Sequence, residues 1–180
     1  SKTEPYFFKL DKKIYNSKYF NNLGSRYEVM KRSIENSISL FRKENIPLSI
    51  KENELTTKYN ELSSKLIVNF NGKEETLVSM RKYLKNPDRT VREKGWRVIY
   101  NELLSNELEF NSIFDNLIKI RENIATNTDY SNYRDYMHIN KGRFDYTVSD
   151  IYEFHDSVKE IVVPFLKELN NEKKLKLGVD

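Results

Sequence analysis

The chain has 180 residues, with 31 Lys and Arg against 27 Asp and Glu, which gives a net charge of +4. Hydrophobic residues make up 38% and aromatic residues 13% of it, while Gly and Pro number only 5 and 4. This composition excludes collagen-like and Pro-rich disordered chains, and the absence of cysteine excludes a disulfide framework and thiolate chemistry. No run approaches the roughly 18 apolar residues of a membrane span, so we expect no membrane partner.

Acidic and basic residues alternate along the chain, as in Arg121-Glu122 and Lys167-Glu168. A nucleic-acid-binding protein usually gathers its Lys and Arg on one face. Dispersed charge of this kind is typical of a solvated surface. We therefore expect no nucleic-acid partner.

The first 65 residues are predicted to form a layer of three helices. Apolar residues at helical spacing predict a first helix over residues 6–21, which Gly24 ends. Ser25 and Glu28 match a capping box, which opens a second helix to about Lys43.

The third helix of this layer is predicted to follow a break at Pro47. Ser49 and Glu52 match a second capping box, and the leucines that follow recur at helical spacing up to Leu66. Together these signals predict an antiparallel helical layer over residues 1–65.

Residues 66–84 break the helical pattern. Residues 66–70 are rich in β-branched and aromatic side chains, and Asn71-Gly72 is a strong hairpin signal because both positions accept positive φ. We predict a β-hairpin over residues 66–77 and a short helix to Leu84, although a mere turn between two helices is the alternative. The pair Glu74-Glu75 is interpreted as solubilising surface.

Residues 88–180 are predicted to be helical again, with Asp88 as an N-cap. The expected helices cover residues 89–105, 107–125, 131–140 and 147–173, the second either continuing the first or following a kink. Thr147 and Asp150 open the last helix, and Pro164 inside it removes one backbone hydrogen bond and is expected to kink the axis. The predicted fold is an all-α, multi-helix and mostly antiparallel domain with one small β-hairpin, forming a single unit over residues 1–180.

The chain shows no self-contained active site. Its two histidines, His138 and His155, lie outside any H-E-x-x-H motif, and a zinc site on one helix needs two His at i, i+4. Glu153 and His155 are two positions apart and lie on different faces of a helix, so His155 is interpreted as an ordinary helix histidine. The glycines are too far apart for a phosphate-binding loop. We therefore predict no catalytic, cofactor-binding or metal-binding residue in this chain.

Four stretches, taken together, resemble one family of peptidases. Residues 88–93 look like the D-R-x-x-R-E segment that opens a helix in oligoendopeptidase F and its relatives. Residues 120–133 resemble the family's R-x-x-I-A and G-Y-x-N-Y stretch, with Thr128-Asp129 where a Leu-Gly pair is usual. Residues 144–158 match Y-T-x-x-D-I-x-x-F-H-x-x-V, and residues 161–178 carry the V-V-P and the later L-G. The sequence is therefore identified as similar to the oligoendopeptidase F family of thimet-oligopeptidase-like zinc metallopeptidases.

The resemblance implies a mostly helical fold around a deep channel, with zinc held by an H-E-x-G-H helix and a further Glu. None of these motifs occurs in residues 1–180, which begin without Met and end at Leu177-Gly178-Val179-Asp180. The chain is thus expected to be a non-catalytic N-terminal portion of a cytoplasmic peptidase. Its implied partners are oligopeptide substrates and the missing C-terminal catalytic half, and it would bind no zinc itself.

The part of the chain expected to line the channel is residues 88–180. Tyrosines that are exposed there are candidates for the channel wall, namely Tyr130, Tyr133 and Tyr146, although aromatic helix packing is the commoner role. The alternative function is a stand-alone helical protein-interaction module, which would bind a partner helix in an apolar groove.

Overall fold

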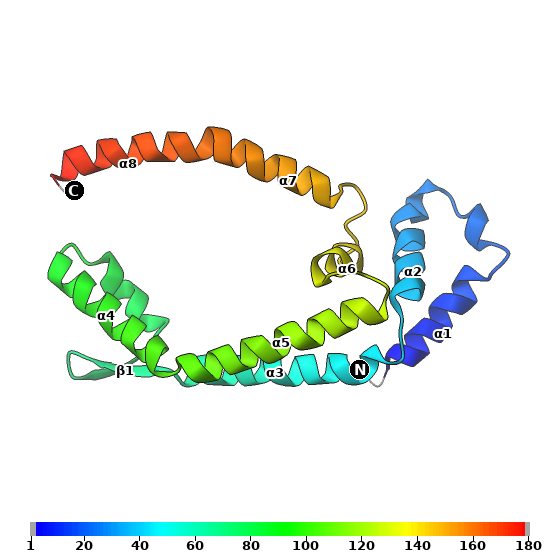
Figure 1. Cartoon of the computed structure of the whole chain (residues 1–180), viewed down its shortest axis with the longest axis horizontal. Helices are drawn as coiled ribbons and strands as arrows, with labels where there is room; N and C mark the ends of the chain where they lie inside the picture. The colour runs from blue at the N-terminus through cyan, green and yellow to red at the C-terminus, as the bar shows by residue number, and fades with distance from the viewer. Residues whose placement is uncertain (1–2, 179–180) are drawn as a thin grey trace. The chain divides into compact units, whose positions relative to one another are not determined.

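The computed structural model describes residues 3–178 and confirms an all-α fold with one small β-hairpin. The helices are α1 (Glu4–Tyr15), α2 (Glu28–Leu40), α3 (Asn45–Lys65), α4 (Arg89–Ser105), α5 (Glu107–Asn127), α6 (Tyr133–Asn140), α7 (Val148–Ser157) and α8 (Val163–Leu177) (Figure 1). The strands are β1 (Ile67–Phe70) and β2 (Lys73–Thr76).

Contacts divide the described residues into two compact units. The first contains residues 3–7 and 41–133, and therefore α3, the hairpin, α4 and α5. The second contains residues 8–40 and 134–178, and therefore most of α1 together with α2 and α6–α8. The arrangement of residues 1–180 as a single helical unit stays a prediction.

The first unit is built on the packing of α5 against α3, which lie side by side (Figure 1). Four buried side chains recur along one face of α5 at i, i+4, i+7 and i+11: Ile113, Leu117, Ile120 and Ile124. This spacing gives a narrow apolar stripe of the kind that packs one helix on another. The opposing face of α3 is only half-buried at Leu48, Leu55 and Leu62.

A buried amide fixes the start of α3 against the end of α5. Asn45 is 7% exposed, and its Nδ2 donates to the carbonyl oxygen of Ile124 at 3.1 Å. Its Oδ1 accepts from Nδ2 of Asn127 at 2.7 Å. Both polar ends of the buried side chain are therefore satisfied, as burial requires.

The predicted start of α3 was wrong. The helix begins at Asn45, four residues before the expected cap at Ser49, so Ser49 and Glu52 lie inside it and form no capping box. Pro47 lies in the first turn, where backbone N–H groups have no intrahelical acceptor and a missing one costs little. Pro47 therefore opens the helix instead of preceding it.

The first two helices also have bounds that differ from the predicted ones. The helix expected over residues 6–21 stops at Tyr15, and the chain then turns Phe20 inward in a 3-10 turn, leaving it 2% exposed. The Tyr15 and Phe20 rings lie 5.2 Å apart. Ser25 lies in a further 3-10 turn instead of capping a helix, and α2 runs from Glu28 to Leu40 instead of to Lys43.

The hairpin forms where Asn71-Gly72 predicted it. Its strands pair antiparallel with Ile67 opposite Thr76 and Phe70 opposite Lys73. Asn71 and Gly72 have φ of 54° and 77°, the positive values that a two-residue hairpin turn requires. Val68 and Phe70 point into a core with Met80 and Ile99, so the hairpin packs on the 3-10 helix Ser79–Lys85 and on α4.

Glu75 corrects the interpretation of Glu74-Glu75 as solubilising surface. Its carboxylate accepts hydrogen bonds from Lys82 Nζ at 2.6 Å, Ser79 Oγ at 2.5 Å and Tyr83 Oη at 2.9 Å. These bonds, that of Lys82 first, lower the pKa of Glu75 from 4.5 to about 2. The carboxylate thus joins β2 to the 3-10 helix, while Glu74 remains exposed.

The caps predicted for the later helices are confirmed, but the last helix is not continuous. Asp88 accepts from the backbone N–H of Thr90, and Thr147 and Asp150 form a reciprocal capping box.

The expected helix 147–173 is divided by a π-helical turn, Val158–Val162, in which the N–H of Val163 donates to the carbonyl of Val158. Such a wide turn accommodates Pro164, which cannot donate to the carbonyl four residues earlier.

Replacing Asn45 by Ala is expected to lower the free energy of unfolding by about 1–3 kcal/mol, because the half-buried amide of Asn127 loses its acceptor and the Ile124 carbonyl loses a donor. Urea denaturation followed by circular dichroism measures the loss. The control is Asn53→Ala, an exposed residue of the same helix. Equal effects of the two substitutions would contradict a special role for Asn45.

Replacing Glu75 by Gln is expected to reduce stability at neutral pH and to have a smaller effect in acid. Because the folded pKa of Glu75, about 2, lies below its ordinary value of 4.5, the ionised carboxylate contributes stability above pH 4.5. That contribution falls as the pH drops toward 2. Denaturation midpoints of wild type and variant between pH 7 and pH 2 measure the convergence, with Glu74→Gln as the control. A gap that does not change with pH would contradict the assignment.

Candidate functional site

The loop between α5 and α6 is the segment that shapes the candidate site. Thr128 is buried, and its hydroxyl donates to the carbonyls of Ile124 and Ala125 at 3.0 and 2.8 Å, within the last turn of α5. Asp129 has a φ of 66°, in the left-handed region, and its carboxylate accepts from Arg42 Nη2 at 2.9 Å.

These two residues stand where the oligoendopeptidase F pattern usually has Leu-Gly. The left-handed φ of Asp129 is the conformation that a glycine adopts without strain, and Asp is among the few other residues that tolerate it. The departure in sequence therefore keeps the backbone turn.

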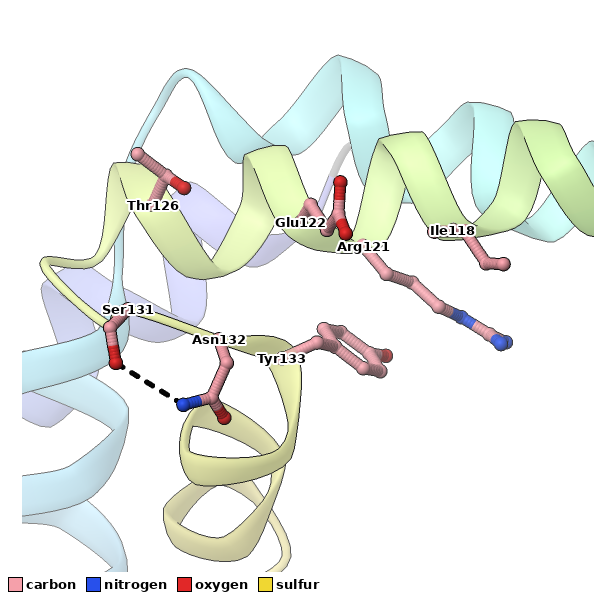
Figure 2. Close-up of a pocket in the computed structure, with 7 residues that line it drawn as sticks. All are labelled: Ile118, Arg121, Glu122, Thr126, Ser131, Asn132 and Tyr133. Atoms are coloured by element: carbon pink, nitrogen blue, oxygen red, sulfur yellow. Dashed lines mark hydrogen bonds between the residues drawn. The ribbon is translucent and has the colours of Figure 1, made fainter.

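A hollow of about 480 Å³ lies between the second half of α5 and this loop, and we call it the polar pocket. Figure 2 shows the side chains that line it, with Asn132 Nδ2 donating to Ser131 Oγ at 3.2 Å. Its lining residues are Ile118, Arg121, Glu122, Thr126, Ser131, Asn132 and Tyr133. They come from only two neighbouring segments of the chain, so the α5–α6 loop determines the shape of the pocket.

Arg121 in the polar pocket is held by two neighbouring side chains. Its Nε donates to Glu52 Oε1, in α3, at 2.7 Å, and its guanidinium lies 5.5 Å from the centre of the Tyr133 ring. The Tyr133 hydroxyl donates to the same Glu52 oxygen at 3.4 Å. Glu52 therefore holds both side chains in place.

The protonation states in this cluster follow from its contacts. The hydrogen bond with Glu52 raises the pKa of Arg121 further, and burial raises the pKa of Tyr133. At neutral pH Arg121 is thus a cation and Tyr133 a neutral hydroxyl. The cluster presents hydrogen-bond donors, with the positive charge of Arg121 paired to the Glu52 carboxylate, and this arrangement suits binding and positioning.

A second hollow, of about 470 Å³, adjoins the first along α5, and we call it the apolar pocket. Most of its lining is aromatic or aliphatic, and Arg121 is its only charged residue. The lining residues are Thr56, Tyr59, Phe110, Asn111, Ile113, Phe114, Leu117 and Arg121. Because Arg121 lines both hollows, the two form one surface with a cation at the junction.

Of the tyrosines expected to line a wall, Tyr133 lies in the polar pocket and Tyr130 is half-buried in the loop before it. Tyr146 is 44% exposed and belongs to the second unit, with α6–α8. Its carbonyl oxygen lies 2.8 Å from Nε2 of His138. Exposure thus leaves Tyr146 available for the expected role, while only Tyr133 lines a described pocket.

The two histidines differ in their surroundings. His138 is 7% exposed and packs edge-on against the Tyr146 ring, so it is a buried structural residue of the second unit. His155 is exposed on α7, as an ordinary helix histidine would be. Among residues 3–178, no group of three or more His, Cys, Asp or Glu side chains is placed to hold a metal ion. None of the helices within these residues combines the length and the apolar character that a membrane span requires.

A family model described as peptidase family M3 matches residues 82–180, more than half of the chain. The chain belongs to peptidase family M3. The matched residues include α4–α8 and all four stretches that resemble oligoendopeptidase F, so the family resemblance is confirmed.

The fold is shared with solved structures of this kind. A crystal structure assigned to oligoendopeptidase F from Bacillus anthracis str. Ames superposes with a TM-score of 0.93 at 23% identity, over 99% of this chain and 33% of that chain. PZ peptidase A with an inhibitor gives 0.93 at 22%, over 99% and 32%. The chain thus spans about a third of the length of these solved chains. A search of curated protein sequences found no match.

Sequence reasoning missed the contact between Glu52 and Arg121. In the sequence, Glu52 forms part of a predicted capping box, while Arg121 is one of the alternating charges and the first residue of the R-x-x-I-A stretch. The two are 69 positions apart, and only the packing of α3 on α5 brings them together. The Arg in the family motif was the one signal that could have pointed to the site.

We expect Glu52 and Arg121 to be coupled by about 1 kcal/mol, because their side chains are only 22% and 33% exposed and the bond is charge-assisted. A double-mutant cycle with Glu52→Gln and Arg121→Met, followed by urea denaturation, measures the coupling. The same cycle on the exposed pair Glu93 and Arg97 is the control and should give less. A coupling near zero for the first pair would contradict the structural role of Glu52.

Proposed function

We propose that this chain is the non-catalytic N-terminal portion of a zinc-dependent oligoendopeptidase that hydrolyses peptide bonds in short peptides. The match of peptidase family M3 to residues 82–180 carries the proposal. In this proposal, residues 88–180 contribute part of the wall of the substrate channel, and the intact protein is cytoplasmic. Its substrates are oligopeptides, and neither nucleic acid nor membrane is a partner.

The exposed apolar side chains of α7, α8 and the π-helical turn between them support a larger parent protein. Phe154, Ile161 and Phe165 are 66%, 71% and 57% exposed. Exposed apolar side chains in such a row are typical of a surface that another part of a protein covers. We propose that the remaining two thirds of the parent cover this face, and we expect the isolated chain to form dimers or to aggregate through it.

Zinc, in this proposal, belongs to the part of the parent outside residues 1–180. The described residues offer no set of ligands for it, since structural and catalytic zinc sites need at least three protein ligands. The residues of this chain would therefore act on the peptide by binding and positioning it. No step of bond cleavage is assigned to them.

The same exposed face is also what a stand-alone helical interaction module would use to bind a partner helix. The two functions differ in what lies downstream of Asp180. A parent peptidase requires an H-E-x-x-H motif and a further Glu in the continuing reading frame, whereas a module requires neither.

The test is made on the polypeptide encoded by the complete reading frame. We expect it to cleave an internally quenched oligopeptide, to lose activity with a metal chelator and to regain it with zinc. The control is the 180-residue chain, which is expected to bind no stoichiometric zinc and to leave the peptide intact. Chelator-sensitive turnover by the 180-residue chain, or a reading frame without H-E-x-x-H, would contradict the proposal.

A further inference from the structure

We propose that Arg121 and the apolar pocket together bind the C-terminal residue of a peptide. The guanidinium would take the terminal carboxylate, and the apolar pocket would take an aromatic or branched aliphatic side chain. This inference rests on the proposed function, since it names the substrate feature that this part of the channel wall recognises.

The hydrogen bonds of Arg121 leave its outer edge available. Its Nε donates to Glu52 at 2.7 Å and its guanidinium also interacts with the Tyr133 hydroxyl, but no carboxylate within residues 3–178 pairs with either Nη nitrogen. Figure 2 shows the side chain extending from α5 beside the ring of Tyr133. A guanidinium fixed through Nε presents its two Nη groups as a fork, and a carboxylate matches that fork with two parallel hydrogen bonds.

The apolar pocket supplies the other half of the site. Phe114 and Tyr59 are 59% and 48% exposed at its rim, while Leu117 is buried beneath them. The Tyr59 and Phe110 rings meet edge to face with centroids 5.6 Å apart. An apolar side chain that enters here leaves water, which favours binding roughly in proportion to the area covered.

Charge selects the C-terminal residue over an internal one. Arg121 is the only charged lining residue of the apolar pocket, so a ligand with an apolar body and an anionic end is complementary to it. An internal peptide unit offers only a neutral carbonyl, whose hydrogen bond to a guanidinium is weaker than that of a carboxylate. Among natural peptides, the C-terminal residue combines an apolar side chain with an adjacent carboxylate.

The polar pocket adds a charge preference at the peptide residue that precedes the C-terminal one. Glu122 lines it as an exposed carboxylate and is not hydrogen-bonded to another described side chain. A peptide that crosses the polar pocket to reach Arg121 therefore meets a negative charge beside the cation. We expect an acidic residue next to the C-terminus to weaken binding and a basic one to strengthen it.

The experiment measures peptide binding by fluorescence anisotropy, using the 180-residue chain without zinc. The probe is a fluorescein-labelled tetrapeptide ending in Phe with a free carboxylate. Matched peptides carry a C-terminal amide or end in Gly. We expect amidation to weaken binding about tenfold, since it replaces a charge-assisted bond by a neutral one, and Gly to weaken it by a similar factor.

The variants separate the two halves of the site. Arg121→Gln should abolish the preference for the free carboxylate, so that acid and amide bind alike. Phe114→Ser alters an exposed rim residue and should instead reduce the preference for Phe over Gly. Arg97→Gln, an exposed arginine of α4 paired with Glu93, is the control and should change neither preference. Circular dichroism of each variant verifies that it folds.

Equal binding of acid and amide to the wild-type chain would overturn the proposal, and this comparison requires no variant. A second copy of the chain in the apolar pocket would also overturn the proposal. Sedimentation would then show a dimer that Phe114→Ser dissociates, and no peptide would bind. Failure of this inference and failure of the proposed function can be told apart. If the polypeptide encoded by the complete reading frame does not cleave peptides, the proposed function is wrong. The ratio of the affinities for the free-carboxylate and amidated peptides tests only the binding site at Arg121.

Discussion

The packing of α5 on α3 is the contact on which the candidate site depends. It buries one narrow stripe of α5, and the flank of the helix beside this stripe places Arg121 against Glu52 and leaves Phe114 at the rim of the apolar pocket. Asn45 fixes the register of this pair, because its amide reaches both the Ile124 carbonyl and Asn127. A slip of one turn, 5.4 Å along the helix, would separate the guanidinium from its carboxylate and leave both charges partly buried.

Features that were predictable from the sequence are those decided by a few neighbouring residues. Asp88 and Thr147 cap their helices, and Asn71-Gly72 makes the hairpin, because each acts on backbone groups within three positions. Ser25 and Ser49 carry the same local signals, yet neither caps a helix. At Ser49, packing on α5 extends α3 back to Asn45, so tertiary burial outweighs the local preference.

The candidate site was not predictable in the same way, since its parts meet only through the fold. Arg121 and Glu52 come from different helices. Glu75 resembles a solvent-facing charge in the sequence, but in the fold its carboxylate accepts hydrogen bonds from Lys82, Ser79 and Tyr83. At Asp129 the residue differs from the family pattern, but the backbone conformation is the one that the pattern's Gly would adopt. Its left-handed φ occurs where the family pattern has Gly, and Arg42 pairs with the carboxylate that Gly would lack.

The helices α7 and α8 lack the buried apolar face that usually stabilises helices of this length. Neither has a buried residue, although the two and their π-helical turn run from Val148 to Leu177. Helix propensity alone stabilises such a segment only marginally in water, and packing of an apolar face usually supplies the rest. Here the ends carry the local stabilisation: a capping box at Thr147 and a left-handed Gly178. These caps define where the helix begins and ends, and its apolar face supplies further stability only when another surface covers it.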